Sequence, residues 1–187
     1  MLASLSLMLM AVALVLGFSI GDLYANPPEA ASFLWRGRHM LTGVAAALAV
    51  VFVESIAVTY FIGTSRWVKE VTETYRLPAA DLAESSRLKR RTFPWCVLGM
   101  LTVVAVGALG AAADPGTGRP DTESMAGIHQ LAALAGLCII AYTYYRAWLS
   151  IAANQDVIAR IVEQVQHIRT ERGLDAPPAR APVIQAG

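Results

Sequence analysis

Histidine is the residue type in this chain best suited to holding a cofactor. The 187 residues include three, His39, His129 and His167. Neutral imidazole nitrogens are common ligands of haem iron and of transition metals. Imidazoles from two different helices could therefore hold a b-type haem, with Arg36 and Arg38 meeting anionic groups such as its propionates. His39 and His129 are the candidate ligands of a haem or a metal, and the identity of any metal stays open.

The depths of the two histidines bear on this hypothesis. Each stands at the start of an apolar stretch that runs inward from the same side of a membrane. His129 lies six residues past Glu123, about 9 Å deeper if that segment is already helical. This offset disfavours ligation of one haem by both rings, unless the helix carrying His39 begins well before Met40. The alternative is a pair of interfacial histidines bonded to backbone, water or lipid headgroups. His167 is expected to be a solvated helix residue.

Glu54 is the second candidate, as an intramembrane functional residue. It interrupts the apolar run Val51–Ile56, and an ionisable group at that depth is costly unless it faces other helices. It could hold a proton, bind a cation, or simply cross-link helices through hydrogen bonds. At helical rise it lies about 22 Å from His39 and cannot join that site. Its candidate partners are Thr59, Tyr60, Thr102, Tyr142, Thr143 and Arg146.

Motifs of known enzymes are missing from the sequence. There is no HExxH, GxSxG, P-loop or GxGxxG pattern. Cys96 and Cys138 are too few for a disulfide framework or a four-cysteine zinc site. A formal net charge of +1 gives no basic surface for nucleic acid. We therefore expect the chain to be a non-catalytic protein, with an enzyme complex as one setting in which it could serve.

The elements that position these residues follow from composition. Hydrophobic residues make up 56% of the chain and charged residues 16%, with a mean hydropathy of +0.49. Soluble domains carry about a quarter charged residues, so the composition indicates a membrane protein. Four apolar stretches approach the roughly 20 residues that span a bilayer. They cover about residues 2–20, 40–62, 95–113 and 126–149.

Orientation follows from the basic residues. Twelve of the fifteen Lys and Arg residues fall in the 63–94 loop or from Arg146 onward, and three fall on the other side. The 63–94 loop and both termini are therefore expected on the cytoplasmic side. The expected location of the protein is a bacterial inner membrane. The tryptophans agree, because all four lie at span ends, the headgroup level that indoles favour. They are Trp35, Trp67, Trp95 and Trp148.

The predicted fold is an all-α, integral membrane four-helix bundle over residues 1–150, with cytoplasmic helical extensions of the second and fourth spans. The second span should continue to Leu77, and Pro94 should open the third. Residues 151–173 should form an amphipathic helix that packs within the chain or on another subunit, with a free coiled coil as the alternative. Its apolar seam holds Ile151, Asn154, Ile158, Ile161, Val165 and Ile168. The tail, 174–187, should be disordered.

Three functions remain open at this point. The leading one is an accessory or anchoring subunit of a larger membrane complex, with electron transfer as one role of that complex. Its partners would be the lipid bilayer and either other membrane subunits or further copies of itself. The second is a b-type cytochrome subunit that uses His39 and His129. The third is a homo-oligomeric proton or cation transport component that uses Glu54.

Overall fold

The chain is helical throughout the part that the computed structural model describes, residues 1–21, 23, 30–119 and 121–174. The helices are α1 (Leu2–Phe18), α2 (Ala30–Tyr75), α3 (Ala79–Ala112) and α4 (Thr122–Glu171), with a short 3-10 turn at Pro115–Thr117. No strand occurs in these ranges, so the all-α prediction is confirmed. The expected disordered tail lies outside the described residues, apart from Leu174.

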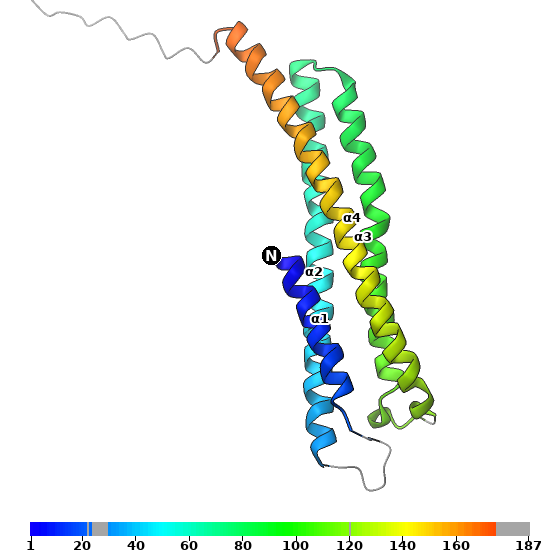
Figure 1. Ribbon diagram of the computed structural model, residues 1–187. Helices are drawn as coiled ribbons and strands as arrows, with labels where there is room; N and C mark the ends of the chain where they lie inside the picture. The colour runs from blue at the N-terminus through cyan, green and yellow to red at the C-terminus, as the bar shows by residue number, and fades with distance from the viewer. Residues whose placement is uncertain (22, 24–29, 120, 175–187) are drawn as a thin grey trace, which may run out of the picture.

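Three of the helices are long and the first is short. α2, α3 and α4 lie side by side, alternating in direction, and α1 packs against α2 and α4 (Figure 1). The N-terminus lies beside the middle of α2 (Figure 1). We call the part where α1 packs the covered half (2–18, 30–53, 97–112 and 122–144), and the part beyond it the stalk (58–75, 79–95 and 148–171).

Three helices are long and apolar enough to cross a membrane. They are Ser32–Tyr75, Ala79–Ala112 and Thr122–Glu171. α1 is also apolar but has 17 residues, which is about 26 Å of helix against a hydrocarbon core of about 30 Å. The four apolar stretches expected from the sequence thus all fall in helices, and the first is the shortest.

The segment 63–94 is a helical hairpin rather than a loop. α2 runs to Tyr75, close to the expected end at Leu77, and α3 begins at Ala79. Arg76 makes the turn in the left-handed region, with φ 55°, and the Leu77 amide bonds back to the Thr72 carbonyl at 3.0 Å, as in a Schellman motif.

Pro94 does not open the third helix, as the sequence had predicted, but lies inside α3. Proline deprives the carbonyl four residues earlier of its helical donor. Thr92 and Cys96, on either side of Pro94, are both buried. Packing of these neighbours on the other helices keeps α3 continuous, so tertiary contacts outweigh the local cost.

The stalk has a core of large side chains. Phe61, Val68, Leu88, Val157 and Ile161 are buried together, and each of the three long helices contributes. Residues 151–171 continue α4 without a break, and their apolar seam packs on α2 and α3 of the same chain. The expected packing is therefore intramolecular. Outside this core, Arg160 bonds to Asp81 and Glu84 of α3 at 3.0 and 2.7 Å.

One asparagine ties the three long helices together within the stalk. Asn154 of α4 is fully buried. Its Oδ1 accepts a 2.8 Å hydrogen bond from the Ser85 hydroxyl of α3. Its Nδ2 donates to the hydroxyls of Tyr60 and Thr64 on α2, both at 3.2 Å. A buried polar side chain satisfied in this way fixes the register of the helices around it.

Replacing this asparagine should loosen the stalk. Asn154→Ala removes three hydrogen bonds and leaves the buried Ser85 hydroxyl without a partner, so we expect a loss of about 1–3 kcal/mol in the free energy of unfolding. Thermal unfolding in mild detergent, followed by circular dichroism, measures it. Gln166→Ala, on the exposed face of α4, is the control and should change stability little. Equal effects of the two variants would contradict the register role.

Candidate functional site

The two candidate histidines lie in contact, at the end of the covered half far from the stalk. The ring centroids of His39 and His129 are 6.0 Å apart, with the rings inclined at 76°. α2 begins at Ala30, nine residues before His39. His39 is therefore well inside a helix, and the difference in depth that the apolar stretches suggested does not separate the rings.

Each histidine rests on a glycine of the preceding helix. A Cβ on Gly17 of α1 would lie 3.1 Å from the His39 ring, and a Cβ on Gly110 of α3 would lie 3.0 Å from the His129 ring. Both distances are tighter than ordinary van der Waals contact. The absence of a side chain at these two positions is what lets the imidazoles lie between the helices.

The backbone also orients the rings. The Nδ1 atom of His39 lies 2.8 Å from the Ala13 carbonyl, which fixes the tautomer with a hydrogen on Nδ1 and leaves Nε2 as the free nitrogen. In the hairpin formed by α3 and α4, the Val106 carbonyl faces the His129 ring. The buried Nδ1 of His129 nevertheless makes no well-formed hydrogen bond within the described residues. Ala13 and Val106 each stand four residues before the glycine that receives the ring.

The two arginines proposed as partners of anionic groups have other contacts. Arg36 forms an ion pair with Asp114 at 2.7 Å, linking α2 to the turn after α3. The Arg38 guanidinium lies over the Trp35 ring, 4.9 Å from its centroid. Partial burial raises the pKa of Asp114, but hydrogen bonds from Arg36 and from the Gly116 amide outweigh this, and the pKa is lowered overall. Both arginines are therefore engaged with other side chains of the same chain.

Glu54 is fully buried between α2, α3 and α4. Of the partners expected from the sequence, Thr143 is the one that contacts it, at 2.8 Å from Oε1. The Cys96 thiol is within hydrogen-bonding reach. Cys96 is itself fully buried. Gly99 provides the space, because a Cβ there would collide with the carboxyl group of Glu54.

The hydrogen-bond pattern bears on the protonation of Glu54. The Thr143 hydroxyl is 2.8 Å from both the Glu54 carboxyl and the Ile140 carbonyl. A hydroxyl has one hydrogen to donate. Both contacts can be full hydrogen bonds only if Glu54 carries a proton and donates it to Thr143. The Oε2 atom has no hydrogen-bond partner within the described residues, so this carboxyl group keeps spare bonding capacity.

Other expected partners of Glu54 are engaged elsewhere. Arg146 donates to the Tyr142 hydroxyl at 3.0 Å and lies over the Trp95 ring. Tyr60 accepts a hydrogen bond from Asn154.

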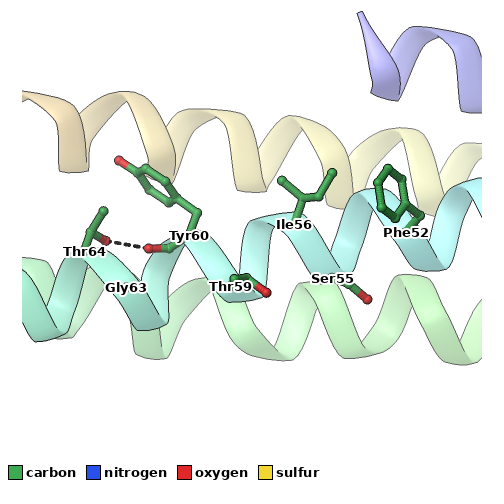
Figure 2. A pocket seen from close by; sticks show the side chains of 7 residues that line it. All are labelled: Phe52, Ser55, Ile56, Thr59, Tyr60, Gly63 and Thr64. Carbon is green, nitrogen blue, oxygen red and sulfur yellow. Dashed lines mark hydrogen bonds between the residues drawn. The ribbon is translucent and has the colours of Figure 1, made fainter.

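A shallow groove runs along α2 beyond the end of α1, between Phe52 and Thr64 (Figure 2). The hydroxyls of Ser55 and Thr64 in this groove bond to their own helix, so they offer no free donor to a ligand.

Sequence reasoning missed three features of the site. The glycines Gly17, Gly99 and Gly110 are ordinary in an apolar helix until the opposing side chain is known. The proximity of Cys96 to Glu54 depends on how α2 and α3 pack, and the sequence does not show that packing. The buried hydrogen bond between Ser6 of α1 and Tyr144 of α4, at 2.7 Å, had no sequence signal beyond two polar residues in apolar stretches.

Comparison of the chain with models of protein families, with curated proteins and with solved structures finds no significant match.

The position of the Glu54 carboxyl group against Gly99 can be tested with two glycine substitutions on α3. Gly99→Ala would place a methyl group against the carboxyl group of Glu54 and 3.1 Å from the Thr143 hydroxyl, so we expect a loss of about 1–3 kcal/mol. Gly107→Ala is the matched control, because a Cβ there meets nothing within 4 Å, and better helix propensity should stabilise α3 by up to about 1 kcal/mol.

Thermal unfolding of both variants in detergent measures the difference. Combining Gly99→Ala with Glu54→Ala should recover part of the loss, because the obstacle is removed. A Gly99→Ala protein as stable as Gly107→Ala would show that the carboxyl group does not occupy this place.

The Arg36–Asp114 pair should make stability depend on acid. Because the pKa of Asp114 is lowered in the folded chain, its contribution is present above the unfolded value of about 3.9 and is lost as the pH falls through the folded value. For a partly exposed pair we expect up to about 1 kcal/mol. Melting temperatures from neutral pH to below about pH 3 should fall less steeply for Asp114→Asn than for the exposed control Asp156→Asn. Parallel curves would contradict the pairing.

Proposed function

We propose that the chain is a haem-binding subunit of a membrane electron-transfer complex, embedded as a four-helix bundle, with His39 and His129 as the two axial ligands. The observation that carries the proposal is the contact between these rings, whose centroids are 6.0 Å apart. They come from α2 and α4, the second and fourth helices. Neutral imidazoles that two different helices bring into contact are the residues that would hold the iron of a haem bound there.

Coordination chemistry favours haem over a bare metal ion. Structural zinc takes four protein ligands and catalytic zinc three. No group of three or more His, Cys, Asp or Glu residues that could hold an ion occurs in the described ranges. Two imidazoles alone leave such an ion short of ligands. Haem iron already has four equatorial nitrogens from the porphyrin, so two histidines complete its coordination.

The surroundings of the rings resemble what an axial histidine requires. An axial imidazole is oriented by donating its other N–H to a carbonyl group, and the Ala13 carbonyl takes this place for His39. The glycines Gly17 and Gly110 hold the rings between helices. Haem bound there would supply one-electron chemistry. The chain's own part is to hold the iron in place and to exclude water with apolar helices.

Insertion in a bilayer is supported by the change of packing along the helices. In the covered half the core contains small residues such as Ala13, Ala46 and Gly136, while large apolar side chains such as Leu41, Leu48 and Leu131 face outward. Small residues at helix contacts and large apolar ones outside are typical of helices in lipid. The distribution of basic residues favours a cytoplasmic stalk, and we propose the bacterial inner membrane as the location.

Absorption spectroscopy tests the proposal. The full chain, expressed with a haem supply and purified in mild detergent, should show a Soret band and a low-spin, six-coordinate spectrum. His39→Ala or His129→Ala should each abolish the low-spin spectrum, because the iron loses one axial ligand. His167→Ala is the control, since His167 is exposed on the stalk and pairs with Glu171, and its spectrum should match the original.

Two outcomes would refute haem binding at this site. One is a wild-type protein without a Soret band after purification from haem-replete membranes. The other is a low-spin spectrum that survives the loss of both His39 and His129, since a haem bound elsewhere would be its source. Purification of the native assembly then tests the subunit role, because an accessory subunit should elute with other membrane proteins, and a chain that elutes alone has no such role.

A further inference from the structure

A cleft between α2 and α3 lies where the covered half gives way to the stalk. We call it the α2–α3 cleft, and its lining residues are Ile62, Ser65, Arg66, Lys69, Leu82, Ser86, Lys89 and Phe93. Three of them are cationic and none is acidic. The cleft is part of the hairpin that carries seven of the fifteen basic residues, and a positive cleft of this kind attracts anions.

The basic residues of the cleft are unequally paired. Arg66 is held by Glu70 on the same helix at 2.8 Å, and Lys69 stands 3.9 Å from Glu73 with both side chains largely exposed. An exposed pair of this kind stabilises little. Lys89 makes no ion pair in the part of the chain described here. Lys69 and Lys89 are therefore available to a negatively charged ligand.

Ser65 is the unusual member of the lining. Its hydroxyl is buried and has no hydrogen-bond partner within the described residues. Ser55, Thr64 and Thr74 on the same helix donate to the carbonyl four residues earlier. Thr72 shares the unpaired state of Ser65 but does not line the cleft. A buried hydroxyl left unpaired costs free energy, and one that lines a cationic cleft is placed to donate to a bound oxyanion.

The two ends of the cleft differ in polarity. Ile62 and Phe93 stand at the end nearer the covered half, and Trp67 and Trp95 lie nearby in the sequence, at the level expected for lipid headgroups. Lys69 and Ser86 stand farther along the stalk. Leu82 also lies at this far end, but all three basic residues stand beyond Ile62 and Phe93. The cleft thus runs from apolar to basic, in the order of acyl chain and phosphate in a phospholipid.

We propose that the α2–α3 cleft binds the headgroup of an anionic phospholipid of the cytoplasmic leaflet, with Lys69 and Lys89 contacting its phosphate and the Ser65 hydroxyl donating to a phosphate oxygen. The proposal rests on the membrane insertion proposed above, and it is independent of haem. It assigns a lipid-specific role to residues that the redox site does not use.

Lipid titration of the full chain tests this site. Native mass spectrometry of the protein in mild detergent follows the binding of phosphatidylglycerol and of phosphatidylcholine. Removing one basic contact near a membrane surface should weaken anionic lipid binding about fivefold, so Lys69→Gln with Lys89→Gln should weaken phosphatidylglycerol binding about 30-fold. Ser65→Ala should weaken it severalfold without a change of charge. Phosphatidylcholine binding should be weak and should not change.

The matched control removes the same charge outside the cleft. Arg87 and Arg90 are exposed on α3 and do not line the cleft, so Arg87→Gln with Arg90→Gln should weaken phosphatidylglycerol binding much less. An equal loss of phosphatidylglycerol affinity in both double variants would show that the loss comes from net charge alone, and it would overturn the proposed site. Equal binding of the two lipids would also overturn it, as would displacement of phosphatidylglycerol by inorganic phosphate at equal concentration, which would indicate a soluble anion.

Failure of membrane insertion gives a different result. Flotation with vesicles of phosphatidylcholine and phosphatidylglycerol, after alkaline washing, should retain the wild type and all variants. If every protein is released by the wash, insertion itself is wrong, and the lipid site fails with it. If all float while the cleft variants bind phosphatidylglycerol as well as the wild type does, only the lipid site is wrong.

Discussion

Buried polar side chains between α2 and α4 need hydrogen-bond partners inside the protein, and this constraint fixes how the helices align. Three polar contacts follow one another along α2: the ring contact of His39 with His129, and the hydrogen bonds of Glu54 with Thr143 and of Tyr60 with Asn154. A shift of α4 by one residue would rotate its side chains by about 100° and break all three contacts at once. Apolar packing alone sets register weakly in lipid, since lipid tails compete with side chains.

The two helical hairpins, α1–α2 and α3–α4, accommodate their histidine rings in a similar way. In α1–α2 the ring of His39 lies on Gly17 and faces the carbonyl of Ala13. In α3–α4 the ring of His129 lies on Gly110, again four residues after the carbonyl that faces the ring. The surroundings of the two imidazoles are therefore similar, although only the Nδ1 atom of His39 makes a well-formed hydrogen bond within the described residues. Opposed rings of this kind suit a ligand bound between the hairpins better than two unrelated interfacial histidines.

The sequence predicted the helices, their approximate spans and the position of Glu54 facing other helices, because apolar length and an isolated acid are local signals. It placed Thr143 among several partners but could not choose it, since the choice depends on the rotation of α4 about its axis. The Pro94 signal was wrong, because buried Thr92 and Cys96 hold α3 together across the proline. The role of Gly110 could not be predicted, because it depends on which side chain of another helix packs against this glycine.

The surfaces of α1 and of the stalk differ in polarity. The outward side chains of α1, among them Leu5, Met8 and Val15, are exposed and apolar, so this helix has no face suited to water. The stalk instead buries Phe61 and Ile161 and carries the Arg160 ion pairs outside. Because α1 packs beside the covered half alone, the change in polarity along the bundle falls between the covered half and the stalk. In the bilayer proposed above, this level would lie close to the lipid headgroups, and the α2–α3 cleft lies just beyond it on the stalk.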